Sequence, residues 1–224
     1  YDMPMHGLVR KTPLRAEKES GTRLSFSYAD NEETHKYYPF RFLYKVTFSL
    51  EGNRMAVTTT VQNTDDKPVC FGVGGHPGFF VPMEEGLSFE DYYIRFERAK
   101  DLRQCVMTND VLFSGMTPSY PLDGDKLWLR HSLFPVDALV LMNTGGRAVI
   151  ASDKGKRRVA MEYPDMKYMG VWQVAGSDAP YICLEPWSML PASAARRDDF
   201  ETKPDMTRLP VGETYRNTWT LEIE

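Results

Sequence analysis

Two short stretches of the sequence each place an ionisable residue directly before a proline. The first, Cys70–Phe79, contains His76, and the second, Tyr181–Trp187, contains Glu185. A proline ring crowds the backbone before it and pushes the preceding residue into extended geometry. Both groups are therefore predicted on restrained backbone at the end of a sheet element, where an imidazole and a carboxylate could act as a general acid/base pair.

The alternation in the second stretch predicts the surroundings of its carboxylate. In a strand, a period of two puts Tyr181, Cys183 and Glu185 on one face and Ile182 and Leu184 on the other. Apolar neighbours raise the pKa of a carboxyl group toward the range that is useful for a base. The alternative is an exposed acid at the end of a strand, and the spacing alone does not decide between the two.

Glycines surround the histidine of the first stretch. Gly72, Gly74 and Gly75 remove side chains just before His76, so another chain or a ligand could approach the backbone closely. The alternative is a histidine whose hydrogen bonds are satisfied in a turn. A dinucleotide-binding loop is excluded, because Pro77 breaks the G-x-G-x-x-G pattern and no helix is predicted after it.

Three further residues are candidates for binding a ligand. His6 and Arg10 are four residues apart, which in a strand would point both side chains to one face. The guanidinium could fork onto hydroxyls or a carboxylate, although two solvated surface residues would have the same spacing. Asp137 precedes the apolar run 138–142, where it would accept a hydrogen bond from a hydroxyl or solvate a loop.

The composition favours one globular domain over residues 1–224. The chain has 224 residues, and its 27 Lys and Arg against 31 Asp and Glu give a net charge of −4. No long basic stripe is present, so we expect neither a nucleic-acid partner nor binding to an anionic membrane. No hydrophobic run approaches the roughly 18 residues of a membrane span, and no signal peptide is recognised.

Neither the cysteines nor the histidines form a metal-binding motif. The histidines are scattered, and H-x-H, H-E-x-x-H and C-x-x-C are all absent. We therefore expect no metal and no cofactor. The odd number of widely spaced cysteines indicates a reducing compartment, and hence a cytoplasmic protein, rather than a disulfide framework. The three are Cys70, Cys105 and Cys183.

Alternating hydrophobicity predicts many strands and almost no helix. Only residues 192–200 suggest a short helix, and residues 101–135 are expected to be irregular. Many strands separated by turns are typical of an all-β sandwich or barrel. The expected strands are 24–28, 41–50, 55–61, 92–97, 138–142, 147–151, 157–163, 168–175, 181–185 and 215–223.

Taken in order, these segments resemble the aldose 1-epimerase (galactose mutarotase) family, and most closely its bacterial LacX-like branch. The similarity runs from Met5 to the C-terminus. We expect that several N-terminal strands of the family are missing from this chain. The segments that show the resemblance are His6–Arg10, Asn63–Pro68, Gly74–Phe79, Phe89–Tyr93, Asp137–Val140 and Ile182–Trp187.

The resemblance implies a galactose mutarotase-like β-supersandwich that interconverts the anomers of a monosaccharide without a cofactor. It implies that Glu185 removes the proton from the C1 hydroxyl and that His76 donates a proton to the ring oxygen. His6 and Arg10 would hold the ring oxygen or hydroxyls, and Asp137 would bind hydroxyls of the sugar. The identity of the sugar and the oligomeric state are left open, with a homodimer as one candidate.

Three other functions fit the same residues. A hexose-6-phosphate 1-epimerase would need additional Arg or Lys at the pocket rim. A carbohydrate-binding or sugar-sensing protein could share the fold without catalysis. A glycosidase could use Glu185 together with a second carboxylate such as Asp137, provided that the two are about 5–10 Å apart.

Overall fold

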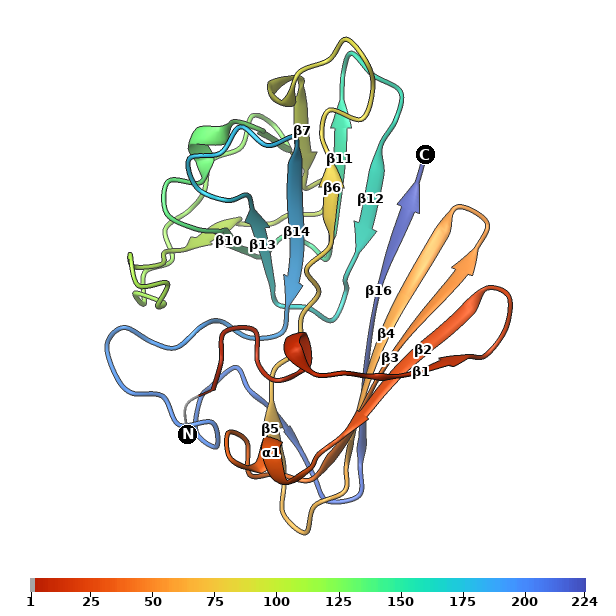
Figure 1. Cartoon of the computed structure of the whole chain (residues 1–224). Helices are drawn as coiled ribbons and strands as arrows, with labels where there is room; N and C mark the ends of the chain where they lie inside the picture. The colour runs from red at the N-terminus through yellow and green to blue at the C-terminus, as the bar shows by residue number, and fades with distance from the viewer. Residues whose placement is uncertain (1–2) are drawn as a thin grey trace. The chain divides into compact units, whose positions relative to one another are not determined.

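The computed structural model describes residues 3–224, which form β-strands joined by loops and a few short helical turns (Figure 1). The chain divides into two compact units, and each is described by itself. Unit 1 contains the described residues up to Phe71 together with Thr207–Thr220. Unit 2 contains Gly72–Met206 and Leu221–Glu224. None of the helices in the described part of the chain is long and apolar enough to cross a membrane.

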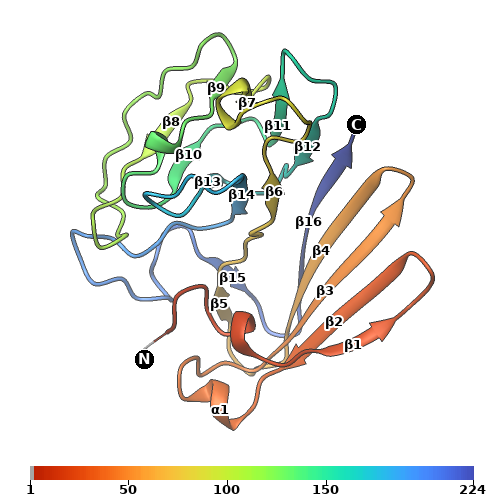
Figure 2. The same cartoon turned by 45° about the horizontal axis from the view of Figure 1, so that its top comes forward.

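Unit 1 is built on consecutive antiparallel hairpins, which Figure 2 shows from a second direction. The sheet order is β1-β2-β3-β4-β16, and β5 pairs separately with β15. A tight turn at Gly52, which has a φ of 58°, joins β3 to β4. The elements are η1 Val9–Lys11, β1 Arg15–Lys18, β2 Arg23–Ala29, α1 Glu32–His35, β3 Phe42–Glu51, β4 Arg54–Asn63, β5 Val69–Phe71, β15 Thr207–Leu209 and β16 Thr214–Ile223.

Unit 2 contains two antiparallel sheets. One has the order β12-β11-β7-β9 and the other has the order β6-β14-β13-β10-β8. The elements are β6 Gly78–Phe80, η2 Phe89–Asp91, β7 Tyr92–Arg95, β8 Arg103–Cys105, β9 Lys126–Trp128, η3 His131–Leu133, β10 Leu139–Met142, β11 Arg147–Ser152, β12 Val159–Glu162, β13 Tyr168–Trp172 and β14 Tyr181–Trp187.

Alternating apolar residues of both sheets form the core of unit 2. Ile94 and Ile150 from one sheet and Met169, Ile182 and Leu184 from the other are fully buried. Burying a side chain of this size stabilises the fold by about 1.5–3 kcal/mol. This core fixes which face of β14 points away from it, and that face includes Glu185.

Three local predictions outside the acid/base pair were wrong. Residues 101–135 are not irregular throughout, because they contain β8, β9 and η3. Residues 192–200 are not helical, because their backbone donors bond elsewhere: Ser193 N–H donates to the Asp198 carboxylate and Ala194 N–H donates to the Phe113 carbonyl. The segment from His6 to Arg10 is a turn followed by η1 rather than a strand. His6 has a φ of 65°, which lies in the left-handed region and is incompatible with a strand.

Candidate active site

Glu185 lies on β14, which is the second strand of the five-stranded sheet of unit 2, between β6 and β13. Its strand extends two residues beyond the predicted end and includes the proline after Glu185. The predicted alternation is confirmed on the core side, where Ile182 and Leu184 are fully buried. Glu185 itself is also buried, with only 3% of the residue exposed. The alternative of an exposed acid at a strand end is therefore wrong.

His76 lies on an irregular segment rather than at the end of a strand, but that segment runs antiparallel to β14. Each contact along it follows one register, and this register places His76 directly opposite Glu185. The contacts that fix it are the Gly74–Trp187 bridge, the hydrogen bonds Ser188 N to Val73 O (2.9 Å), Gly75 N to Pro186 O (3.0 Å) and Leu184 N to Pro77 O (3.2 Å), and the Gly78–Cys183 pairing.

The two prolines open the backbone ladder at this pair. In this register His76 and Glu185 form a non-hydrogen-bonded pair, the type in which facing side chains are closer together. In each of the two flanking residue pairs one ladder hydrogen bond is present and the other is missing, because its donor would be the nitrogen of Pro77 or Pro186, and proline has no N–H. The His-Pro and Glu-Pro dipeptides of the sequence therefore lie opposite each other on neighbouring segments, and one proline follows each of the two ionisable residues.

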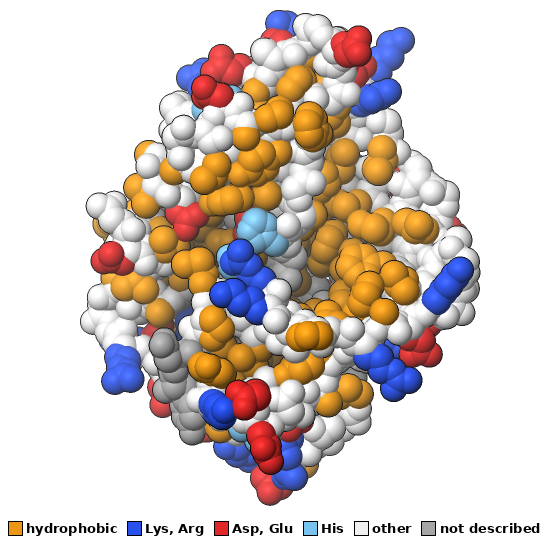
Figure 3. Space-filling model, in the orientation of Figure 1, with side chains coloured by type: hydrophobic (Ala, Val, Ile, Leu, Met, Phe, Trp, Pro, Cys, Tyr) orange, Lys and Arg blue, Asp and Glu red, His pale blue; other side chains and the backbone are white. Residues whose placement is uncertain are grey.

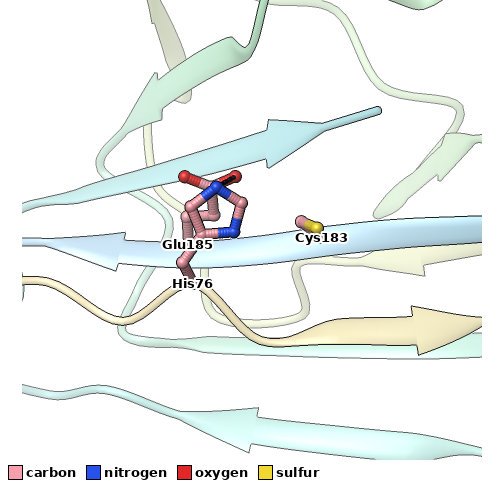
Figure 4. A group of neighbouring side chains, drawn as sticks. All are labelled: His76, Cys183 and Glu185. Carbon is pink, nitrogen blue, oxygen red and sulfur yellow. Dashed lines mark ion pairs between the residues drawn. The ribbon is translucent and has the colours of Figure 1, made fainter. Parts of the chain in front are cut away.

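The imidazole and the carboxylate are in contact. His76 Nε2 lies 3.3 Å from Glu185 Oε1, as the dashed line in Figure 4 marks. The His76 side chain is 43% exposed, whereas the Glu185 side chain is only 4% exposed. The ring of Trp172 contacts the imidazole edge-on, with 5.5 Å between ring centroids. On the face shown in Figure 3, histidine side chains reach the surface beside hydrophobic ones.

The surroundings of Glu185 change its proton affinity. Burial raises the pKa of its carboxyl to about 8, while a hydrogen bond with Trp187 acts in the opposite direction. The negative charge of Asp137 raises this pKa further. Asp137 is half-buried just before β10, so the structure brings it within electrostatic reach of Glu185. A carboxyl group with a pKa near neutrality is suited to accept and return a proton.

His6 and Arg10 are both exposed and belong to unit 1. Their predicted part in binding a ligand stays a prediction.

Gly170, which pairs with Glu185 from β13, was not predicted as part of the site. A Cβ atom at this position would lie 2.7 Å from Trp187 Cζ2 and 3.2 Å from Glu185 Cβ. Glycine is therefore required there for both side chains to fit. The available signal was a single glycine inside the alternating pattern of residues 168–175, which indicates a close approach.

Cys183 was given no role in the site from the sequence. All three cysteines are buried and free, which agrees with the predicted lack of a disulfide framework. The thiol of Cys183, however, lies beside the pair: its sulfur, the His76 nitrogen and the Glu185 oxygen are all within 4.8 Å of one another (Figure 4). The sequence analysis placed Cys183 and Glu185 on one strand face, but it did not connect the thiol to His76.

Known proteins share both the sequence pattern and the fold. A family model described as aldose 1-epimerase matches residues 1–222. The chromosomal protein LacX of Lactococcus lactis subsp. lactis is 28% identical over an alignment of 227 positions, which covers 97% of this chain and 74% of the relative.

Two solved structures are similar over the whole chain. A galactose mutarotase related enzyme from Lactobacillus acidophilus has a TM-score of 0.91 and 28% identity, covering 100% of this chain and 75% of that one. A galactose mutarotase-like protein from Lactobacillus casei ATCC 334 has a TM-score of 0.92 and 28% identity, covering 100% and 77%. These similarities confirm the predicted all-β, galactose mutarotase-like fold.

Proposed function

Because the chain belongs to the aldose 1-epimerase family, we propose that it is a cofactor-independent isomerase that interconverts the α and β anomers of a hexose. The observation that carries this proposal is the contact between His76 and the buried Glu185. One group can donate a proton and the other can accept one, and anomer exchange requires both steps.

The chemistry acts on two oxygens that are bonded to the same sugar carbon. Glu185 removes the proton from the C1 hydroxyl while His76 donates a proton to the ring oxygen, and the ring opens. Rotation about the C1–C2 bond presents the other face of the carbonyl, and the ring closes as the two groups exchange roles. A donor and an acceptor 3.3 Å apart suit two oxygens this close together. Each proton transfer contributes about 10²–10⁴-fold to the rate.

Access to the carboxylate depends on its more exposed neighbour. The Glu185 side chain is almost fully buried, while a large part of the His76 side chain is exposed. We infer that the imidazole turns aside when a sugar enters, so that the C1 oxygens come between the two groups. Catalytic hydrogen bonds commonly take their final geometry only in the complex with substrate.

The remaining ring hydroxyls need partners that hold the sugar in place. Asp137 is the candidate acceptor in unit 2, because its carboxylate acts on Glu185 across the site. His6 and Arg10 are proposed as further sugar-binding residues on the strength of the family resemblance. A guanidinium suits this role because it presents several donors in a rigid, planar fork.

The test follows anomer exchange by polarimetry or NMR with freshly dissolved α-glucose and α-galactose. The wild-type protein should accelerate equilibration, and Glu185→Gln should lower kcat by about 10²–10⁴-fold because the amide cannot accept the proton. Glu85→Gln, which changes an exposed acid in the same unit, should be fully active. Wild-type protein that binds a sugar but leaves equilibration at the spontaneous rate would refute the enzyme and favour a binding protein.

A further inference from the structure

The contact between His76 and Glu185 is not a hydrogen bond. Glu185 Oε1 is buried and accepts no hydrogen bond from any residue that the structure describes, although His76 Nε2 is 3.3 Å away. A buried carboxylate oxygen without a donor loses its hydrogen bonds to water and gains none in exchange, which is energetically costly. The site thus offers a strong electron-pair donor that the protein itself leaves unsatisfied.

The separation of these two atoms suits two ligands of one small cation. Zinc binds histidine nitrogen and carboxylate oxygen at about 2.0–2.2 Å in tetrahedral geometry. Two ligand atoms at these distances and at the tetrahedral angle lie about 3.3–3.5 Å apart. The observed 3.3 Å between His76 Nε2 and Glu185 Oε1 falls at this value.

Cys183 supplies a third ligand atom of a type that zinc prefers. Its sulfur lies within 4.8 Å of both other ligand atoms, close enough for the three side chains to hold one ion. The neighbouring position across the strands is Gly78, whose missing side chain leaves space beside the sulfur. Three protein ligands with a fourth, open position form a common arrangement for zinc in proteins.

We propose that His76, Cys183 and Glu185 form a binding site for Zn²⁺ or a divalent cation of similar softness, and that the bound cation inhibits the enzyme. The cation would occupy both members of the acid/base pair and exclude the C1 oxygens of the sugar. The inhibition rests on the proposed function, whereas cation binding does not. The sequence predicted no metal site because the three ligands share no recognisable spacing: His76 is more than a hundred residues from the other two.

The ligand types predict which cations bind. A thiolate and an imidazole favour Zn²⁺ over Mg²⁺ and Ca²⁺, which prefer oxygen ligands. A thiol binds a metal ion as the thiolate, so a protonated Cys183 must lose its proton when the cation binds. Cation binding should therefore release protons and strengthen as the pH rises.

The experiment is a calorimetric titration of untagged protein with Zn²⁺ alone, in two buffers that differ in ionisation enthalpy. We expect one site per chain and no comparable binding of Mg²⁺. Because the released protons bind to the buffer, the apparent enthalpy of Zn²⁺ binding should differ measurably between the two buffers. Cys183→Ser should weaken Zn²⁺ binding by about tenfold or more, since even indirect partners of metal ligands contribute about 10–100-fold. Cys105→Ser is the matched control, because Cys105 is a buried thiol in the same sheet but outside the cluster.

The outcomes separate the site from the function. Equal Zn²⁺ affinity of wild type and Cys183→Ser, or an equal loss in Cys105→Ser, would overturn the site. If Cys183→Ser does not fold, Zn²⁺ binding by wild type without proton release would overturn it instead. Tight Zn²⁺ binding by a protein with no anomerase activity would support the site and refute only the proposed function. Anomerase activity that is unchanged at saturating Zn²⁺ would overturn the inhibition.

Discussion

Glu185 is a carboxyl group that folding moves out of water without giving Oε1 a hydrogen-bond donor from the described residues. Burial, assisted by the charge of Asp137, raises its pKa from 4.5 to about 8. Between these two pH values the folded protein holds a proton that the unfolded chain has lost. The contribution of Glu185 to stability is therefore fully present below about pH 4.5 and is lost as the pH rises through about 8.

This linkage predicts that Glu185→Gln changes stability in a pH-dependent manner. A neutral amide does not titrate, so the variant should gain stability relative to wild type by roughly 2–5 kcal/mol between pH 5 and pH 9. The measurement is urea unfolding of both proteins at the two pH values. The difference in free energy of unfolding between variant and wild type is taken at each pH, and subtracting one from the other removes the pH-independent packing effect of the substitution. Glu85→Gln should show no such gain, and a gain of equal size in that control would contradict the assignment to Glu185.

At the scale of the elements, the site depends on three adjacent segments of one sheet. β14 presents Glu185, the segment before β6 presents His76, and β13 presents no side chain at Gly170. Ser188 joins two of these segments, because its hydroxyl accepts a hydrogen bond from Val73 N–H at 2.9 Å. The position of the acid/base pair is thus fixed by backbone register rather than by flexible loops.

Gly170→Ala tests this dependence. The added methyl group would lie 2.7 Å from the Trp187 ring, so the ring and the neighbouring Glu185 must shift. Overpacking of this kind costs about 1–3 kcal/mol of stability, and a displacement of about 1 Å at a catalytic group lowers activity by about 10²-fold. Thermal unfolding and kcat would be measured together. Gly21→Ala is the control, since a Cβ atom there meets nothing within 4 Å, and equal behaviour of the two variants would refute the role of Gly170.

The sequence predicted those features that depend on alternation and on single residues. The two-residue period of apolar and polar side chains located most strands and the buried face of β14. The two X-Pro dipeptides identified His76 and Glu185. It could not predict that residues 192–200 lack a helix, because the backbone partners come from Phe113 and from a nearby side chain. Nor could it show Gly170 or Cys183 beside the pair, since these contacts depend on register between strands that only the folded sheet defines.

At the scale of the whole molecule, the distribution of charge bears on the substrate. The chain has a net charge of −4, and the charge that acts on Glu185 is another carboxylate, Asp137. Five basic residues of unit 2 lie around a cavity of about 350 Å³, which none of His76, Asp137 or Glu185 lines. Its charged lining residues are Arg95, Glu97, Arg147, Lys156, Arg157, Arg158 and Glu224.

This distribution predicts a preference for free hexoses over hexose 6-phosphates. A phosphate group brought to the acid/base pair would meet the charge of Asp137 and, above about pH 8, also that of Glu185, and like charges in a poorly solvated site repel strongly. We expect kcat/KM for glucose 6-phosphate to be lower than for glucose by about tenfold or more, which corresponds to about 1.4 kcal/mol. This difference in kcat/KM between the two sugars should become smaller as the ionic strength rises from about 0.01 to about 0.5 M, because salt screens the repulsion. Faster exchange of the phosphorylated sugar at every salt concentration would instead identify a hexose-6-phosphate 1-epimerase, and the free hexose would then be the poorer substrate.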